Sequence, residues 1–406
     1  MTNRQAAIQI IRRLHRNGFE ALLAGGCVRD MLLRRRAKDY DIATNAHPKE
    51  VTRLFRRTLK VGAKFGVVIV LLKDARVEVA TFRTETGYAD GRHPGRVEFA
   101  DAEEDASRRD FTINGMFYDP LAKKVIDYVG GRADLENRLI RTIGDPQQRF
   151  AEDFLRMLRA VRFSTQLGFP IEAATKSAIR TNAKKITRIS CERITVELEA
   201  ILVNPNRSAG VSLLVECGLA DAIFPGLSGD QLNFAISALD KLRKKVDFAL
   251  ALSAFFSACG TDSALESCRI LMLSRNQTKQ VKFLLANREV LLDEQMSLGR
   301  LRLLFAEPYF WDLYDLQRAI LKATDDGLTP LIKLHRRISA LGDMEKKPIP
   351  LLNGHDLIRL GAVPGPALGQ LAQEMYIAQL EGQFQNREQA KRWVQKWLEK
   401  HKTIGE

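Results

Sequence analysis

The sequence has no apolar run close to the ~18–20 residues that a membrane-spanning helix requires, so it predicts no membrane anchor. Cysteine is scarce, with five residues scattered at positions 27, 191, 217, 259 and 268 and none in a CxxC pair. This spacing argues against a structural zinc site, and an odd count without a disulfide-like pattern suits a reducing compartment. Short-period repeats and low-complexity tracts are also missing. We therefore predict a globular, cytoplasmic protein.

Acidic residues are in the minority: 63 Lys and Arg face 49 Asp and Glu, which gives a formal net charge of +14. Such a charge can serve solubility alone, but Lys and Arg also gain affinity for phosphates by displacing counterions. Basic clusters occur at Arg34–Arg36 with Lys38, at Lys241 with Arg243–Lys245, and at Arg336–Arg337. Their spread along the chain predicts a long polyanionic ligand rather than one small pocket.

The length of 406 residues predicts two to four subdomains. The chain opens with an amphipathic helix that has Ile8, Ile11 and Leu14 on one side. This helix could imitate a transit peptide, but it leads directly into a predicted strand, so we interpret it as part of the fold.

Strand and helix signals alternate over the first 140 residues. Strands are expected at 21–26, 39–44, 65–73 and 76–83, and helices at 28–36 and 47–55. Residues 84–96 are polar and rich in glycine, which predicts a mobile loop. From about residue 147 nearly every segment has a helical pattern. The sequence therefore predicts an α/β head followed by an all-helical remainder.

A glycine turn and an acidic pair carry the chemistry of the head. Gly25–Gly26 lies between a strand and a helix, where backbone N–H groups can approach a phosphate, and Arg29 adds a charge. Asp39 and Asp41 follow, two residues apart and so on one face of a strand. Carboxylates combined with substrate phosphate oxygens suit Mg²⁺, and two such ions can activate a 3′-hydroxyl and neutralise pyrophosphate. Glu78, on a neighbouring strand, is either a third member or a surface glutamate.

Two arginine motifs follow. Arg108 and Arg109 suit a triphosphate, because guanidinium groups pair with phosphate oxygens, while Asp110 is placed to hold an arginine or a ribose hydroxyl. Asn114 is a candidate ribose contact.

Residues 152–163 predict one helix with an apolar stripe and, on the other side, charged residues at every third position. These charged residues are Asp153, Arg156, Arg159 and Arg162. Asp153 and Arg156 offer an acceptor and a donor fork that can match the Watson–Crick edge of cytosine or adenine. Arg159 and Arg162 would then face phosphates. A salt-bridged surface helix is the alternative.

In five segments the sequence resembles the class II tRNA nucleotidyltransferases, the CCA-adding enzymes, and their bacterial poly(A) polymerase relatives. The segments are residues 22–51, 77–99, 103–120, 125–163 and 189–202. The resemblance implies an α+β head with a nucleotidyltransferase palm at 1–140, built on a mixed sheet with helices. It also implies a helical neck at 141–205, a helical body at 206–306, and a helical tail at 307–406 that binds tRNA.

The resemblance also implies roles for individual residues. Asp39 and Asp41 would bind the metals, and Gly26, Arg29 and Arg109 the incoming nucleotide. Asp153 and Arg156 would select CTP and then ATP without a nucleic-acid template, with Arg159 and Arg162 lining the same site. Asp127 with Gly130–Gly131 matches a hinge motif, and Glu192–Arg193 matches a neck-stabilising motif. The implied partners are the tRNA 3′ end, CTP and ATP, with no obligatory protein partner evident.

Several activities share these head motifs, so an A-adding enzyme and a poly(A) polymerase stay open as alternatives. Enzymes that add only CC are described as lacking the flexible loop, which is intact here at 84–96. Residues 350–357 and 364–366 are similar to tails of CCA-adding enzymes, which favours tRNA. A His355–Asp356 phosphohydrolase site lacks a further His–Asp set. A non-catalytic RNA-binding protein is disfavoured, because unused buried carboxylates are costly.

Overall fold

The computed structural model describes residues 1–406 except 60–65, 74, 87–95, 341–347 and 403–406. The chain divides into two compact units, one of residues 1–232 with 269–272 and one of residues 233–268 with 273–406. The boundary falls inside the predicted body, and the division into head, neck, body and tail stays a prediction. Most of the predicted loop at 84–96 lies outside the described residues.

The first unit begins with a mixed seven-stranded sheet in the order β3-β4-β5-β2-β1-β8-β9. Strands β2 and β5 are parallel, and the other neighbouring pairs are antiparallel. The strands are β1 (Ala21–Ala24), β2 (Asp41–Thr44), β3 (Thr58–Leu59), β4 (Val67–Leu72), β5 (Ala75–Thr81), β8 (Phe117–Asp119) and β9 (Lys124–Ile126). A separate two-stranded sheet pairs β6 (Arg83–Thr86) with β7 (Arg96–Phe99). The predicted mixed sheet is confirmed.

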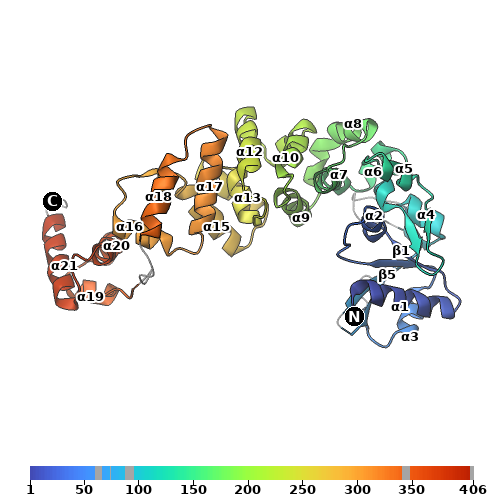
Figure 1. Cartoon of the computed structure of the whole chain (residues 1–406), viewed down its shortest axis with the longest axis horizontal. Helices are drawn as coiled ribbons and strands as arrows, with labels where there is room; N and C mark the ends of the chain where they lie inside the picture. The colour runs from blue at the N-terminus through green and yellow to red at the C-terminus, as the bar shows by residue number, and fades with distance from the viewer. Residues whose placement is uncertain (60–65, 74, 87–95, 341–347, 403–406) are drawn as a thin grey trace. The chain divides into compact units, whose positions relative to one another are not determined.

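Helices cover both faces of the seven-stranded sheet (Figure 1). Helix α1 (Asn3–Arg16) and helix α3 (Pro48–Leu54) lie on one side, and α2 (Gly26–Leu32) lies on the other. Helix α1 packs Ile10, Ile11 and Leu14 against the strands with no exposed surface, so the predicted amphipathic helix is part of the fold. Helix α4 (Ala102–Ser107), the 3-10 turn η2 (Thr112–Asn114) and α5 (Gly131–Glu136) complete this region.

The predicted hinge motif forms a tight turn before α5. The Asp127 carboxylate accepts backbone N–H bonds from Val129, Gly131 and Arg132 at 3.1, 3.0 and 2.8 Å. Gly130 has a φ of +77°, in the left-handed region that favours glycine. Movement about this turn stays a prediction.

Two predicted boundaries are wrong. Strand β2 begins at Asp41, so Asp39 precedes the strand instead of sharing its face. The helix expected at 152–163 is two helices, α6 (Pro146–Glu152) and α7 (Leu155–Leu167), separated by Asp153 and Phe154. Asp153 has an extended backbone with φ −152° and ψ 105°, and its carboxylate accepts the N–H of Leu155 at 3.0 Å. A helical pattern cannot detect this break, because both sides of it are helical.

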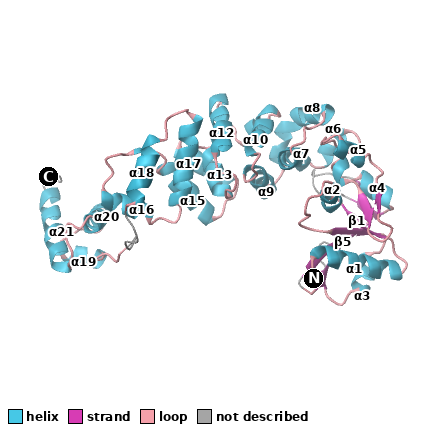
Figure 2. Cartoon of the chain, in the orientation of Figure 1, coloured by secondary structure: helices cyan, strands magenta, loops and turns pink. Residues whose placement is uncertain are grey.

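Beyond β9 the described elements are all helical, as predicted (Figure 2). The first unit continues with α8 (Ala173–Asn182), η3 (Ala183–Arg188), α9 (Cys191–Leu202), α10 (Arg207–Glu216) and α11 (Leu219–Ile223), and α12 (Gly229–Lys241) crosses the boundary. The following helices are α13 (Phe248–Phe255), α14 (Thr261–Ile270), α15 (Arg275–Ala286), η4 (Val290–Leu292), α16 (Leu298–Phe305), α17 (Phe310–Ala323), α18 (Thr329–Ser339), α19 (Gly354–Arg359), α20 (Pro366–Leu380) and α21 (Arg387–Lys402). Among the described helices, none has the length and apolar character needed to cross a membrane.

The His355–Asp356 pair has a structural explanation at the start of α19. The Asp356 carboxylate accepts the backbone N–H of Asn353 at 3.0 Å and forms an ion pair with Arg387 at 2.9 Å. The Asn353 side chain accepts the backbone N–H of Asp356 in return. The aspartate therefore caps a helix and pairs with a neighbouring one.

Candidate active site

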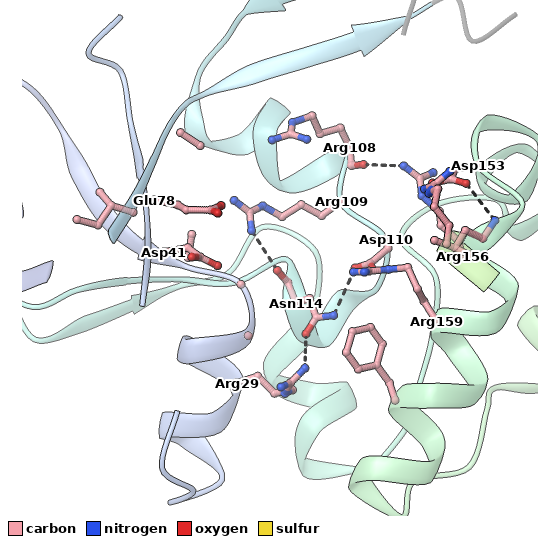
Figure 3. A pocket seen from close by; sticks show the side chains of 18 residues that line it. Arg29, Asp41, Glu78, Arg108, Arg109, Asp110, Asn114, Asp153, Arg156 and Arg159 are labelled. Atoms are coloured by element: carbon pink, nitrogen blue, oxygen red, sulfur yellow. Dashed lines mark hydrogen bonds and ion pairs between the residues drawn. The ribbon is translucent and has the colours of Figure 1, made fainter. Parts of the chain in front are cut away.

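One cavity of about 530 Å³ brings the predicted motifs of the first unit together. The predicted residues that line it are Gly26, Arg29, Asp41, Glu78, Arg108, Arg109, Asp110, Asn114, Asp153, Arg156 and Arg159. In Figure 3, Asp41 and Glu78 lie on the side of the sheet, Asp153 and Arg156 lie beside the helices, and Arg109 and Asp110 lie between them. Two predicted residues, Asp39 and Arg162, do not line this cavity.

The glycine turn forms the floor beside Arg29. Gly25 has a φ of +72°, and a Cβ atom on it would lie 3.2 Å from an Nη atom of Arg109. Glycine is needed there both for the left-handed backbone and for the close approach of an arginine. Arg29 is buried, pairs with Asp30 at 2.7 Å, and donates to the Asn114 side-chain oxygen at 2.8 Å. The turn and the buried arginine therefore form one corner of the cavity, in which several contacts fix the direction of Arg29.

Carboxylates gather at the edge of the sheet. Asp41 is exposed to solvent, yet the protein around it desolvates its carboxylate in part, and this desolvation raises its pKa to about 6. The carboxylates of Glu78 and Asp39 add to the increase, because each disfavours a second negative charge nearby. Glu78 faces this cavity, so it is a neighbour of the pair and not a remote surface residue. The cluster has an excess of negative charge that a cation would neutralise.

Asp105 holds both arginines of the RRD motif. Its carboxylate forms ion pairs with Arg108 at 2.7 Å and with Arg109 at 2.9 Å. Burial alone would raise the pKa of Asp105, but the two guanidinium groups lower it below its ordinary value. Arg109 also donates to the backbone oxygen of Asn114 at 3.4 Å. Asp105, which the sequence pattern did not single out, therefore holds the predicted pair of arginines in place.

Asp110 connects this motif to the arginine-rich helix α7. The carboxylate accepts bonds from Arg159 at 2.5 and 2.8 Å and from the Asn114 amide at 3.3 Å. Its burial raises its pKa, and Arg159 together with Arg156 more than reverses that effect, so the pKa is lowered. Of the two predicted roles for Asp110, holding an arginine is the one that the structure shows. Asn114 in turn joins Asp110 to Arg29.

The two side chains of the predicted base-reading pair have separate partners. Asp153 forms an ion pair with Arg193 of α9 at 2.6 Å. Arg156 is buried, pairs with Glu152, and donates to the backbone oxygen of Arg149 at 3.0 Å. Nη1 of Arg193 is buried and has no hydrogen-bond partner among the described residues. An acceptor on a ligand would satisfy this donor beside Asp153.

Arg162 points away from the cavity. It pairs with the buried Glu197 of α9 at 3.2 Å. Phe163, which follows it, is buried and lines the cavity. The Phe163 ring has the guanidinium groups of Arg162, Arg29 and Arg159 at 4.5, 5.3 and 5.4 Å from its centroid. Sequence reasoning missed Asp105, Glu152, Phe163 and Glu197, which all act on arginines that it found. Asp105 and Glu152 pair with arginines three or four residues away, a helical spacing that could have identified them, whereas Glu197 has no local signal because its partner Arg162 lies on another helix.

The carboxylates at the sheet edge suit a divalent cation whose coordination is completed by the substrate. Among the described residues, no three His, Cys, Asp or Glu side chains are close enough to hold a metal by themselves. Mg²⁺ commonly takes one or two carboxylates and completes its coordination with water and phosphate oxygens. Asp41 and Asp39, with the raised pKa of Asp41, fit that kind of site.

Comparisons with known proteins agree with this geometry. The family "Poly A polymerase head domain" matches residues 21–141, and "Probable RNA and SrmB- binding site of polymerase A" matches residues 168–230. The CCA-adding enzyme of Lactobacillus johnsonii is 34% identical over 393 residues, which are 95% of each chain. The crystal structure of the Bacillus stearothermophilus CCA-adding enzyme in complex with CTP matches all of both chains with a TM-score of 0.78 and 30% identity.

The mixed sheet, its acidic edge and the arginine-lined cavity define a nucleotidyltransferase. More particularly, the chain belongs to the family of the CCA-adding enzymes. The CCA-adding enzyme of a Geobacillus species, 49% identical over 216 residues that are 53% of each chain, is a further relative. The resemblance seen in the sequence is thereby confirmed.

Proposed function

We propose that the protein adds CCA to the 3′ end of tRNA from CTP and ATP, without a nucleic-acid template. The observation that carries this proposal is a single cavity that combines acidic residues at a sheet edge with arginines and the proposed base-reading pair. The relatives named CCA-adding enzyme, one of them solved with CTP, support the choice of product and substrates. The basic charge of +14 supports an RNA partner.

Asp39 and Asp41 are the proposed metal-binding residues, with Mg²⁺ the proposed ion. When bound, a divalent ion stabilises the charge on the attacking and leaving oxygens of phosphoryl transfer. Arg29 and Arg109 bind the triphosphate, because guanidinium groups match phosphate oxygens. The 3′-oxygen of the RNA forms a bond to the α-phosphorus of the nucleotide and releases its proton to water. The bond from the α-phosphorus to the oxygen that bridges it to the β-phosphorus breaks, and pyrophosphate leaves with that oxygen.

Asp153 and Arg156 are the proposed selectors of the base. A carboxylate accepts the amino group that cytosine and adenine share, and a guanidinium donates to a ring acceptor. Guanine and uracil present a carbonyl oxygen where cytosine and adenine present the amino group, so Asp153 would repel them. Arg193 and Glu152 position the two selectors from either side. Arg159 contributes at the cavity, while Arg162, turned toward Glu197, contributes through the packing of α7.

The division into head (1–140), neck (141–205), body (206–306) and a tRNA-binding tail (307–406) is part of the same proposal. So is a cytoplasmic location, which is supported by five cysteines that are all free thiols. The alternative activities are poly(A) polymerisation and the addition of A alone, and both would use the same cavity.

The product is identified by offering four RNAs to the enzyme with CTP, ATP or both: tRNA ending before CCA, tRNA ending in C, tRNA ending in CC, and a non-tRNA oligonucleotide. With CTP and ATP together, sequencing should show completion of CCA on all three tRNAs and nothing on the oligonucleotide. Long A tails, A alone, or CC alone would each replace the proposal by the corresponding activity.

The metal assignment is tested with Asp41→Ala, which should abolish addition while tRNA binding survives. Asp221→Ala removes an exposed aspartate that does not line the cavity and should leave the rate unchanged. Turnover by both Asp41→Ala and Asp39→Ala would end the assignment. No incorporation of any nucleotide by the unaltered protein with Mg²⁺ would favour a non-catalytic RNA-binding protein.

A further inference from the structure

A second hollow of about 440 Å³ meets the active-site cavity at its acidic edge. The two share Gly26, Arg29 and Asp41 in their walls. The second hollow contains Asp39, which does not line the first. The two proposed metal-binding carboxylates therefore lie at a junction, with Asp41 reached from both sides and Asp39 from one.

The basic residues of the two hollows differ in their pairing. The arginines of the active-site cavity are neutralised by protein carboxylates, namely Asp30, Asp105, Asp110, Glu152 and Asp153. The second hollow is lined by Arg35, Arg36 and Lys38, all of which belong to the basic cluster seen in the sequence. Over the part of the chain that the structure describes, Arg36 and Lys38 have neither an ion pair nor a side-chain hydrogen bond. Arg35 has only a 3.4 Å bond to the backbone oxygen of Gln166. These cations are available to an external anion.

We propose that this second hollow binds the sugar–phosphate backbone of the last nucleotides of the RNA that is extended. The inference rests on the proposed function and adds a location for the second substrate. A transferase of this kind must hold a triphosphate and a 3′-hydroxyl on opposite sides of its metal-binding carboxylates. The active-site cavity has the fixed arginines and the base-reading pair that suit a nucleotide. The second hollow supplies unpaired positive charge and access to Asp39, which suit a strand end.

The exposure of the cations also favours a polymer. Arg35, Arg36 and Lys38 are all exposed, so a strand whose end is beside Asp39 can continue past them into solvent. Contacts of this type bind phosphates without reading bases, which is appropriate for an RNA end whose sequence changes with every addition. A second nucleotide or the departing pyrophosphate would be smaller ligands for the same cations, and the experiment separates them.

The test compares two double variants that remove the same charge. Arg36→Ala/Lys38→Ala removes the cations of the second hollow. Arg12→Ala/Arg16→Ala removes two exposed arginines of α1 that line neither hollow. Steady-state rates are measured with tRNA ending before CCA varied at saturating CTP, and with CTP varied at saturating tRNA. Thermal unfolding of both variants should match the unaltered protein, because all four side chains are exposed.

The Arg36/Lys38 variant should raise the KM for tRNA about tenfold and leave the KM for CTP within about twofold. The slope of log KM for tRNA against log salt should fall by about 1.4, from two phosphate contacts at ~0.7 each for a single strand. The Arg12/Arg16 variant should change neither KM. A rise in the KM for CTP instead would assign the cations to the triphosphate or pyrophosphate. Equal effects of the two variants would mean that Arg36 and Lys38 act only through the net charge of the protein. Both results overturn the inference.

Binding without catalysis separates this inference from the proposed function. Fluorescence anisotropy of the same tRNA, measured without nucleotide, should show weaker binding by the Arg36/Lys38 variant even if the unaltered protein extends no RNA. Unchanged anisotropy together with an unchanged KM for tRNA would overturn the assignment of the second hollow to the RNA backbone. The proposed CCA addition would be unaffected by that result.

Discussion

Replacing Phe163 by Leu tests how the arginines of the active site are oriented. The ring has guanidinium groups from two helices around it, Arg29 from α2 and both Arg159 and Arg162 from α7. Arg29 and Arg159 line the cavity, whereas Arg162 does not. Leucine keeps an apolar side chain but has no π face, so the change removes the interaction that aligns these cations together with the edge-to-face contact to Phe111 at 5.6 Å. Loss of the Phe111 contact lowers stability, whereas loss of the cation contacts weakens nucleotide binding.

The magnitude follows from the number of cations that face the nucleotide. A cation–π contact stabilises by ~0.5–1 kcal/mol at an exposed site and by ~2 kcal/mol when it is desolvated. Two cavity-lining arginines released from the ring would together cost about 1–2 kcal/mol of nucleotide binding, since their carboxylate partners still hold them in part. That corresponds to a rise of ~5–30-fold in the KM for CTP. The kcat should fall less, because the carboxylates at the sheet edge are untouched.

Phe154 provides a matched control. It is 5% exposed against 6% for Phe163, and Lys185 and Arg188 lie over its ring at 5.5 and 5.8 Å. It does not line the active-site cavity. Phe154→Leu should therefore lower the Tm about as much as Phe163→Leu does but leave the KM for CTP unchanged.

The assay is steady-state CTP incorporation with thermal unfolding of the same samples. Phe163→Tyr keeps the ring and should restore most of the nucleotide affinity. If Phe163→Leu lowered only the Tm, in step with Phe154→Leu, the ring would be a packing residue and the reasoning from its cations would be refuted.

Two further predictions concern stability. At Gly131 a Cβ atom would overlap the backbone oxygen of Thr112, so Gly131→Ala should lower the free energy of unfolding by ~1–3 kcal/mol. A Cβ atom at Gly229 would meet no atom within 4 Å, so Gly229→Ala should not lower it. Equal denaturant midpoints for the two variants would contradict this prediction. The pKa of Asp110 is lowered by Arg159 despite the burial of the carboxylate. The ion pair therefore stabilises the fold at pH values above ~3.9, the pKa of an aspartate in the unfolded chain. This stabilisation is lost as the pH falls through the lower pKa of Asp110 in the folded protein. Urea unfolding of Asp110→Asn should therefore show a deficit at pH 7 that shrinks near pH 3, and a constant deficit at both pH values would disagree.

Much of the fold follows from local patterns. The apolar side of α1 places Ile11 and Leu14 correctly but not Ile8, which is half-buried. The alternation along β5 also holds, because α1 packs on one face of this strand. The transition to helices after residue 145 is equally local. The break at Asp153 is less local: its carboxylate caps the N–H of Leu155, two residues away, but it is also held by an ion pair with Arg193, forty residues away. Tertiary contacts override helical periodicity at that point.

The sequence by itself determined the inventory of the active site: a glycine turn, the carboxylates Asp39 and Asp41, and arginines at regular spacing. These are properties of short segments, and their residue types limit the chemistry to phosphate and metal. Only the tertiary structure decided which carboxylates Arg159 and Arg162 meet. Arg159 turns to Asp110 and lines the cavity, whereas Arg162 turns to Glu197 and leaves it. The physical reason is that Asp110 and Glu197 lie on elements distant in sequence from α7, so tertiary packing sets the directions of Arg159 and Arg162.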